Sequence, residues 1–157
     1  ERCGVYSVFL ASEPLAGRRW VEATERKTKT DWAHFIRELA AHYESARKIT
    51  LVMDNLNTHK PGSLYEAFPP AEAKRIWDRF EFVHTPKHGS WLNMAEIELN
   101  VLIRQFLNGR MDSLTKVKAA ITAWQRHRNQ LAAKVNWQFT TVDARVKLRR
   151  LYPTLQA

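Results

Sequence analysis

The stretch ITLVMDNLNTH, residues 49–59, decides the fold. Its first five residues form a short apolar run that ends at a polar loop, which is the pattern of a buried β-strand. Asp54 ends this strand, at the mouth of the sheet, where open α/β sheets bind their ligands. A buried carboxylate without a partner is unfavourable, so a functional role for Asp54 is favoured. The alternative is that Asp54 only begins an Asx-turn, with Asn55 and Asn57 shaping the loop.

A second stretch, HTPKHGSWLNMAE at residues 84–96, ends inside an amphipathic helix. Glu96 and Glu98 lie near the start of that helix but point about 200° apart, so only one of them can face the sheet. Glu96 shares its face with Asn93, whereas Glu98 lies on a more apolar stripe, and this spacing slightly favours Glu96. Either glutamate is also explained as a first-turn acid favoured by the helix dipole. Asp54 facing one of them would provide the oxygen ligands that Mg²⁺ prefers.

The remaining elements follow from short local patterns. Two β-rich runs, at 5–11 and 18–23, flank a connection that contains Pro14 and Gly17, which predicts a hairpin. Capping residues and prolines predict helix starts at Thr30 and Asp31, at Pro69 and Pro70, at Ser113, and at Thr140. A further strand is expected at residues 81–84 and a further helix at residues 92–107. The order β-β-α-β-α-β-α-α-α is typical of an α/β domain in which helices flank a mixed sheet.

Composition limits the class of protein. The chain has 157 residues, 45% of them hydrophobic, including six Trp and seven Phe, which predicts one folded domain rather than a disordered chain. The single cysteine, Cys3, excludes an internal disulfide framework and a cysteine-based zinc site. We find no apolar run long enough to span a bilayer and no signal-peptide pattern, so we expect a cytoplasmic protein that does not bind membranes.

The positive charge is concentrated in the C-terminal third. Residues 1–100 contain 14 basic and 14 acidic side chains, whereas the rest of the chain contains 11 basic residues and only Asp112 and Asp143 as acids. A one-sided basic surface attracts polyanions, which favours DNA as the partner. Arg104 and Arg110 are the first basic residues of this third and are candidate DNA contacts. The alternatives are a solvated helix face, or a DNA-binding module that catalyses nothing.

Histidines close to the two carboxylates raise the question of zinc. His59, His84 and His88 form no ligand pair at helical spacing, and catalytic zinc needs three well-placed ligands, so zinc is disfavoured. We expect His59 and His88 instead to hydrogen-bond near the carboxylates or to meet phosphate. Lys87, in the loop before the helix, is a candidate phosphate contact.

These motifs resemble the catalytic domain of mariner-like DDE transposases, in the bacterial insertion-sequence branch of that superfamily. The resemblance rests on D-N-x-x-x-H at residues 54–59 and on TPKHGSWLNMAE at residues 85–96, with further similarity at 9–17 and 139–153. It covers essentially the whole chain. It implies a ribonuclease H-like fold, as in retroviral integrases, and two Mg²⁺ or Mn²⁺ ions held by three carboxylates.

The resemblance also implies roles for particular residues. Asp54 matches the second carboxylate of the family, and Glu96 matches the third, which decides between Glu96 and Glu98. Asn55, His59 and Asn93 become supporting residues. The implied chemistry is phosphoryl transfer, in which a strand is cut at the element's end and then joined to target DNA, so the implied partners are transposon ends and target DNA. The implied location is the bacterial nucleoid.

One part of the family pattern is missing. The family's first Asp lies on a strand that precedes the hairpin, but the only aspartate before Asp54 is Asp31, which belongs to a helix start. We therefore expect an N-terminally truncated catalytic domain that lacks its first strand and any helix-turn-helix domain. Such a fragment would assemble its two-metal site poorly. It would also expose a strand edge, which predicts lowered stability or self-association, with a homodimer as the simplest form.

Overall fold

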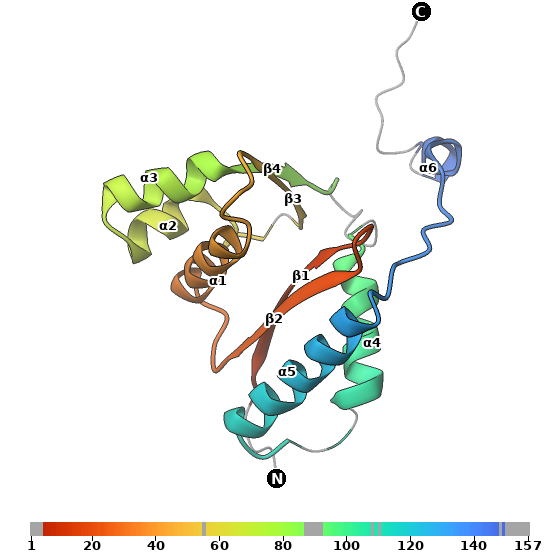
Figure 1. Ribbon diagram of the computed structural model, residues 1–157. Coiled ribbons are helices and arrows are strands. Elements are labelled where there is room, and N and C mark those ends of the chain that lie inside the picture. The colour runs from red at the N-terminus through yellow and green to blue at the C-terminus, as the bar shows by residue number, and fades with distance from the viewer. Residues whose placement is uncertain are drawn as a thin grey trace, which may run out of the picture.

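The computed structural model describes residues 5–54, 56–86, 93–107, 109, 111–147 and 149. Four strands and six helices follow one another along these residues: β1 (Ser7–Glu13), β2 (Arg18–Thr24), α1 (Lys29–His42), β3 (Ile49–Met53), α2 (Pro61–Ala67), α3 (Pro70–Arg79), β4 (Phe80–His84), α4 (Ala95–Phe106), α5 (Leu114–Gln130) and α6 (Thr141–Lys147). Figure 1 shows α1 on one side of the β1–β2 hairpin and α4 with α5 on the other.

The hairpin forms the central layer of the molecule. β1 and β2 pair antiparallel from Ser7 opposite Thr24 to Glu13 opposite Arg18. Alternate residues of β1 face opposite sides because side chains alternate along a strand. One face packs with α1 in one hydrophobic cluster, and the other face packs with α4 and α5 in a second cluster. The hairpin therefore holds the two halves of the core together.

Gly17 closes the hairpin in a way that only glycine allows. Its φ is +67°, in the left-handed region, and a Cβ at this position would collide with the backbone of Ala132. The turn of the hairpin thus lies directly against the segment that follows α5. This contact fixes the chain at the point where α5 ends.

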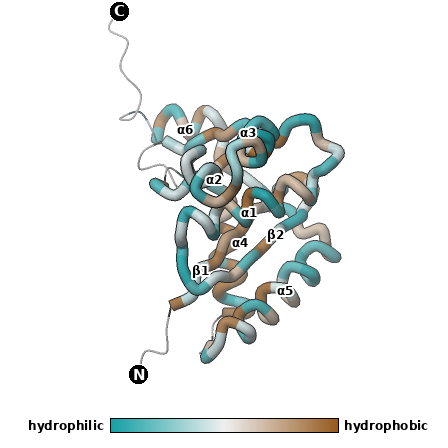
Figure 2. The backbone as a smooth tube through the Cα atoms, turned by 90° about the vertical axis from the view of Figure 1, so that its left-hand side faces the viewer, coloured by the Kyte–Doolittle hydropathy of each residue, from teal (hydrophilic) through white to brown (hydrophobic). Residues whose placement is uncertain are grey.

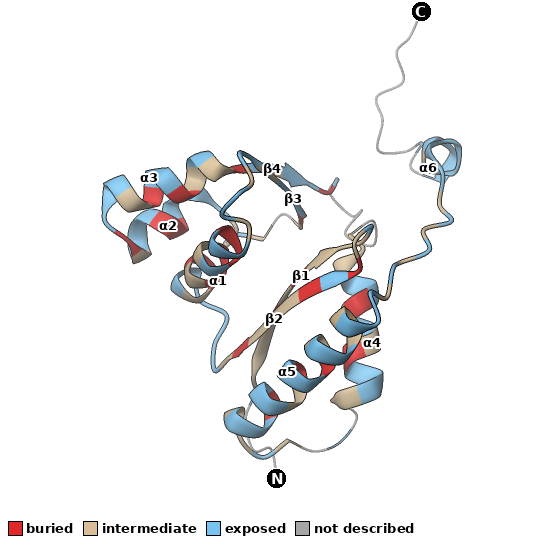
Figure 3. Ribbon diagram, in the orientation of Figure 1, coloured by how far each residue is buried: buried red, intermediate tan, exposed pale blue. Residues whose placement is uncertain are grey.

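β3 and β4 form a parallel pair joined by α2 and α3. Their register runs from Ile49 opposite Phe80 to Met53 opposite His84. Met53 and Phe80 belong to the core cluster shared with α1, α2 and α3. On the opposite face, Val52 and Val83 remain exposed, and Figure 3 shows much of β4 as exposed.

The expected strand positions are confirmed, but the expected single mixed sheet is not what the structure shows. Within the described residues there are two separate two-stranded sheets, one antiparallel and one parallel. β1 and β3 form no ladder with each other, so each of them keeps one edge unpaired. Residues of both strands line one cavity between them, so their backbones do not lie side by side as those of paired strands do.

Several helix boundaries also differ from the sequence-based expectations. α1 is capped by Thr28 rather than by Thr30 and Asp31, because the Thr28 side chain accepts from the Asp31 backbone while the Asp31 carboxylate accepts from the Thr28 backbone. α2 was not expected, since its seven residues form no capping hydrogen bond through a side chain and carry no long apolar period. The Ser113 cap of α5 is confirmed.

The two C-terminal helices differ in how far they enter the core. Hydrophobic and hydrophilic residues alternate along α5 in Figure 2, and its buried residues are Val117, Ile121 and Trp124. α6 buries none of its residues. The predicted end of the last helix before Pro153 lies outside the described residues. Among the helices that the structure describes, none is both long and apolar enough to cross a membrane.

Candidate functional site

A cavity of about 370 Å³ separates the two small sheets. Its walls include residues 8–12 of β1, residues 50–54 at β3, part of α1, and the start of α4. The charged and amide side chains on its wall are Lys27, Asp54, His59, Asn93 and Glu96. Both carboxylates favoured by the sequence, and two of the three supporting residues, therefore line one cavity.

Asp54 lies at this cavity because β3 delivers it there. Met53, the last residue of β3, is buried in the core, and the chain leaves the sheet at Asp54. The Asp54 side chain is 34% exposed, and its Oδ1 lies 2.8 Å from His59 Nδ1. Its second oxygen, Oδ2, accepts no hydrogen bond from any residue that the structure describes. One oxygen of the carboxylate is thus held by the protein, and the other is available to a ligand.

His59 is itself held in place by packing. Its side chain is 11% exposed, and its ring stacks on that of Trp32 with centroids 5.5 Å apart and an interplanar angle of 26°. Burial lowers the pKa of His59, and this effect outweighs the opposing effect of the nearby Asp54 carboxylate. His59 is therefore neutral at pH 7, and its Nδ1–H donates to Asp54.

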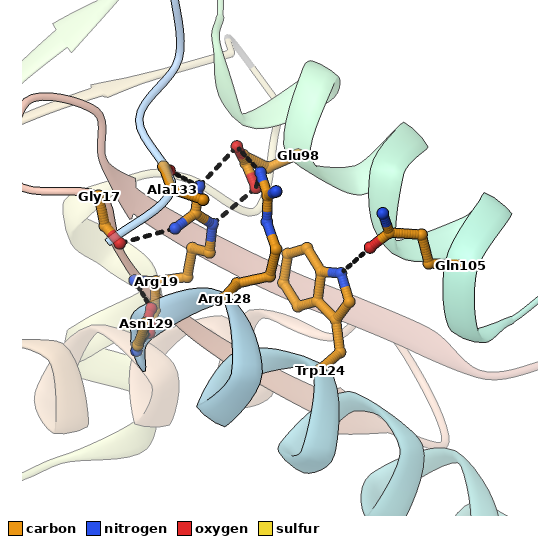
Figure 4. A network of polar contacts seen from close by, with 8 residues as sticks. All are labelled: Gly17, Arg19, Glu98, Gln105, Trp124, Arg128, Asn129 and Ala133. Carbon is orange, nitrogen blue, oxygen red and sulfur yellow. Dashed lines mark hydrogen bonds and ion pairs between the residues drawn. The ribbon is translucent and has the colours of Figure 1, made fainter. Parts of the chain in front are cut away.

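The two glutamates of α4 have different surroundings. Glu96 is exposed and lines the cavity, in agreement with the face shared with Asn93. Glu98 is only 1% exposed and is held by two arginines. Arg19 donates from Nε to Glu98 Oε2 at 2.6 Å and from Nη2 to Oε1 at 2.8 Å, while Arg128 Nη2 lies 3.1 Å from Oε1. Figure 4 shows the three side chains meeting between the hairpin, α4 and α5.

This buried network ties three elements together. Arg19, on β2, also donates to the carbonyl oxygens of Gly17 and Ala133. Burial alone would raise the pKa of Glu98, but the hydrogen bonds and charges of Arg19 and Arg128 lower it overall. Glu98 is therefore fully engaged in the structure of the domain, which leaves Glu96 as the glutamate of α4 that can take a ligand.

Asn93 supports the start of α4. Its Oδ1 accepts from the backbone N–H of Ala95 at 3.1 Å, so it satisfies one of the free N–H groups at the helix start. It lines the cavity between the β3 end and Glu96. Its role in the structure is thus to fix the first turn of the helix that carries Glu96.

Other residues favoured by the sequence are placed differently or lie outside the described residues. Arg104 is exposed on α4. Asn55, Lys87, His88 and Arg110 lie outside the described residues. His84, considered for zinc, is exposed on β4 and does not line the cavity. Across the described part of the chain, no three His, Cys, Asp or Glu side chains form a group that could hold a metal ion.

The sequence did not predict that Lys27 lines the cavity or that Arg19 and Arg128 bind a buried glutamate. Lys27 lies between β2 and α1 and lines the cavity. The cap at Thr28 was the only local signal close to it, and that cap was assigned two residues too late. Arg19 and Arg128 carry no local signal, because their burial depends on a glutamate far away in the sequence.

Comparison with known proteins assigns the chain to a family. The family model described as DDE superfamily endonuclease matches residues 1–118. The chain belongs to the DDE superfamily of endonucleases. No curated protein and no solved structure matches it. The family match includes Asp54, Glu96 and all of α4, whereas most of α5 and all of α6 lie beyond it.

Membership of this family indicates which metals and which substrate the domain uses. DDE superfamily nucleases act on DNA and generally use divalent metals. In this DDE endonuclease domain, Asp54 and Glu96 are partly exposed carboxylates on one cavity, and Asp54 Oδ2 has no partner among the described residues. Carboxylate oxygens are the donors that Mg²⁺ and Mn²⁺ prefer. Asp54 and Glu96 therefore supply the kind of oxygen donor that a divalent cation prefers.

Proposed function

We propose that this DDE endonuclease domain is a transposase catalytic domain that cleaves and joins DNA strands, with a divalent cation held by Asp54 and Glu96. The observation that carries the proposal is that both carboxylates line one cavity, one after a parallel strand and the other at the start of a helix. The motifs at residues 54–59 and 85–96, which resemble mariner-like transposases of bacterial insertion sequences, support the choice of reaction.

The polar residues of the cavity have different roles in this proposal. A bound Mg²⁺ or Mn²⁺ supplies the Lewis acid that phosphodiester cleavage requires. Asp54 and Glu96 bind the cation from two different elements, and Asn93 holds the first turn of α4 so that Glu96 stays in place. His59 occupies Asp54 Oδ1, so that Oδ2 is the oxygen that remains for the cation.

The role of His59 leads to a prediction about metal affinity. His59→Phe keeps an aromatic ring to stack on Trp32 but removes the N–H that donates to Asp54. Because partners that orient a metal ligand typically contribute 10–100-fold in affinity, we expect Mn²⁺ binding to weaken about 10-fold. His59→Asn, whose amide places a donor near the position of Nδ1, is expected to recover part of the loss. Isothermal titration with Mn²⁺ measures both, and equal weakening by Phe and Asn would contradict the orienting role.

We also infer a ribonuclease H-like fold in which a further strand lies between β1 and β3. Within the described residues both strands keep an unpaired edge, and five residues of β1 and four of β3 line the same cavity. A strand placed there would join the two small sheets into one mixed sheet. It would also bring a third carboxylate to Asp54 and Glu96, as the family resemblance implies. With two carboxylates alone, we expect the domain to bind one cation weakly and to assemble a two-metal site poorly.

The two unpaired edges predict self-association, since an open edge pairs readily with another chain. We expect sedimentation velocity to show a concentration-dependent shift from monomer to larger species, with a homodimer as the first step. Thr50→Lys on β3 is expected to shift the equilibrium toward monomer, because edge lysines discourage strand pairing. A single monomeric species at every concentration of the unaltered chain would contradict this expectation.

A second candidate function is DNA binding without catalysis. It is favoured by the exposed basic side chains of the C-terminal third, of which Lys118 and Arg126 lie on α5 and Lys134 follows it. Such a module would bind DNA with a strong salt dependence and without metal. It would leave supercoiled plasmid intact under all conditions.

One experiment separates the two functions. Supercoiled plasmid is incubated with the protein in Mn²⁺ and, in parallel, in EDTA. The transposase proposal predicts open-circular product in Mn²⁺ only, formed slowly because two carboxylates assemble a two-metal site poorly. DNA binding at low salt with no product in either condition would favour the non-catalytic module.

A further inference from the structure

Lys27 holds an unusual position for a surface lysine. It lies in the loop between β2 and α1, one residue before the helix cap Thr28, and it lines the cavity that contains Asp54 and Glu96. Its side chain is exposed, and it forms no hydrogen bond or ion pair with any described residue. Lys27 thus lines the same cavity as the two carboxylates and forms an ion pair with neither.

The neighbouring Lys29 shows the ordinary alternative. Its Nζ lies 2.5 Å from Glu66 Oε1, in an exposed ion pair between α1 and α2. Lys29 does not line the cavity. The two lysines are thus two residues apart in sequence, both exposed, and differ in whether their charge is already matched.

The start of α1 links the loop of Lys27 to Asp54. Trp32, near the start of α1, stacks on the ring of His59, and His59 contacts Asp54. The loop just before α1, which carries Lys27, therefore lies on the side of the cavity where Asp54 lies.

The charges of the cavity indicate what such a group would be. A phosphodiester approaching two carboxylates is repelled by them, and a cation on the same wall offsets that repulsion. The formal charges of Asp54, Glu96, one divalent cation, one phosphodiester and Lys27 sum to zero. Without Lys27, the same assembly would carry a net negative charge.

We propose that Lys27 binds a phosphate of the DNA strand that reaches Asp54 and Glu96. This inference rests on the proposed function, and it adds a substrate contact that lies outside the basic C-terminal third. As a compact point charge, Lys27 positions the backbone and contributes no sequence preference.

The matched pair of lysines provides the test. DNA affinity is measured by fluorescence anisotropy over a series of KCl concentrations, with Ca²⁺ present, for the unaltered protein, Lys27→Ala, Lys27→Arg and Lys29→Ala. Loss of one phosphate contact is expected to reduce the slope of log K against log [salt] by about 0.9 for duplex DNA and about 0.7 for a single strand. We expect that reduction, with a several-fold loss of affinity, for Lys27→Ala only. Lys27→Arg keeps the charge and should retain the slope.

The outcomes separate this inference from the function on which it rests. If the unaltered protein binds DNA and Lys27→Ala and Lys29→Ala have the same slope, the assignment of Lys27 is overturned while the proposed function stands. If the unaltered protein binds no DNA, the proposed function itself fails, and the role of Lys27 fails with it. Thermal melts of all variants check that the fold is unchanged.

Discussion

Asp54→Asn and Glu96→Gln will each abolish Mn²⁺-dependent nicking of supercoiled DNA. Both changes keep the size and shape of the side chain and remove the negative charge that binds a cation. Changing a residue that merely orients a metal ligand reduces affinity or activity by 10–100-fold. Removing a ligand itself should therefore reduce the nicking rate by more than about 100-fold. The rate of open-circular product formation, followed on agarose gels, measures the loss.

Matched controls come from two acids on α3, of which Asp78 is exposed and Glu72 partly exposed. Asp78→Asn breaks an exposed pair with Lys74, and Glu72→Gln changes an acid in the first helical turn, and neither residue lines the cavity. Both control variants should nick DNA at the unaltered rate. Nicking that survives Asp54→Asn and Glu96→Gln would remove both carboxylates from the mechanism.

Arg19→Met will destabilise the fold more than any other single change considered. The Arg19 and Glu98 side chains are 2% and 1% exposed, so the variant leaves Glu98 buried with only Arg128 to match its charge. Breaking a buried ion pair from one side typically costs about 3–5 kcal/mol, a large part of the 5–15 kcal/mol that stabilises an ordinary domain. Urea unfolding followed by tryptophan fluorescence measures the loss.

Two comparisons isolate the buried charge as the cause. Arg37→Met removes an arginine from partly exposed pairs with Glu38 and Glu72 and from the face of the Phe68 ring, and should cost about 1 kcal/mol. Arg19→Met combined with Glu98→Leu should be less destabilising than Arg19→Met alone, since no unmatched charge remains. Equal urea midpoints for Arg19→Met and Arg37→Met would contradict the importance of the network.

The network also sets a direction for the pH dependence of stability. The arginines lower the pKa of Glu98 in the folded state below its value in the unfolded chain. Its contribution to stability is therefore fully present above the unfolded pKa and is lost as the pH falls through the folded pKa. In Arg19→Met, one source of that lowering is gone, so the destabilisation measured at acidic pH should be smaller than that at pH 7.

Short local patterns were sufficient to predict part of the molecule. A strand from Ile49 to Asp54 and the Ser113 cap of α5 are each specified by a few adjacent residues. The structure has the cap, and it has the strand as Ile49–Met53 with Asp54 directly after it. The preference for Glu96 over Glu98 at the cavity also follows from the helical period. The period indicates which face is apolar, and Glu98 indeed lies on the buried one.

The rest depends on partners distant in sequence. Arg19 looks like any surface arginine of a strand, and only Glu98, 79 residues away, makes its burial favourable. Lys27 becomes notable only when β3 and α4 bring Asp54 and Glu96 to the same cavity. Likewise, an alternating pattern predicts a strand but does not say which edges pair, so the separation of the hairpin from the β3–β4 pair could not be predicted.

Whether Asp54 and Glu96 share one divalent cation is tested most directly by Mn²⁺ titration followed by electron paramagnetic resonance, in which free Mn²⁺ gives the signal and bound Mn²⁺ does not. The measurement needs no DNA and no turnover, so it is independent of how well the domain cleaves. We predict that the unaltered protein removes one Mn²⁺ per chain from solution and that Asp54→Asn and Glu96→Gln each lose this binding, while Asp78→Asn retains it. Unchanged Mn²⁺ binding in both cavity variants would contradict the assignment of the site.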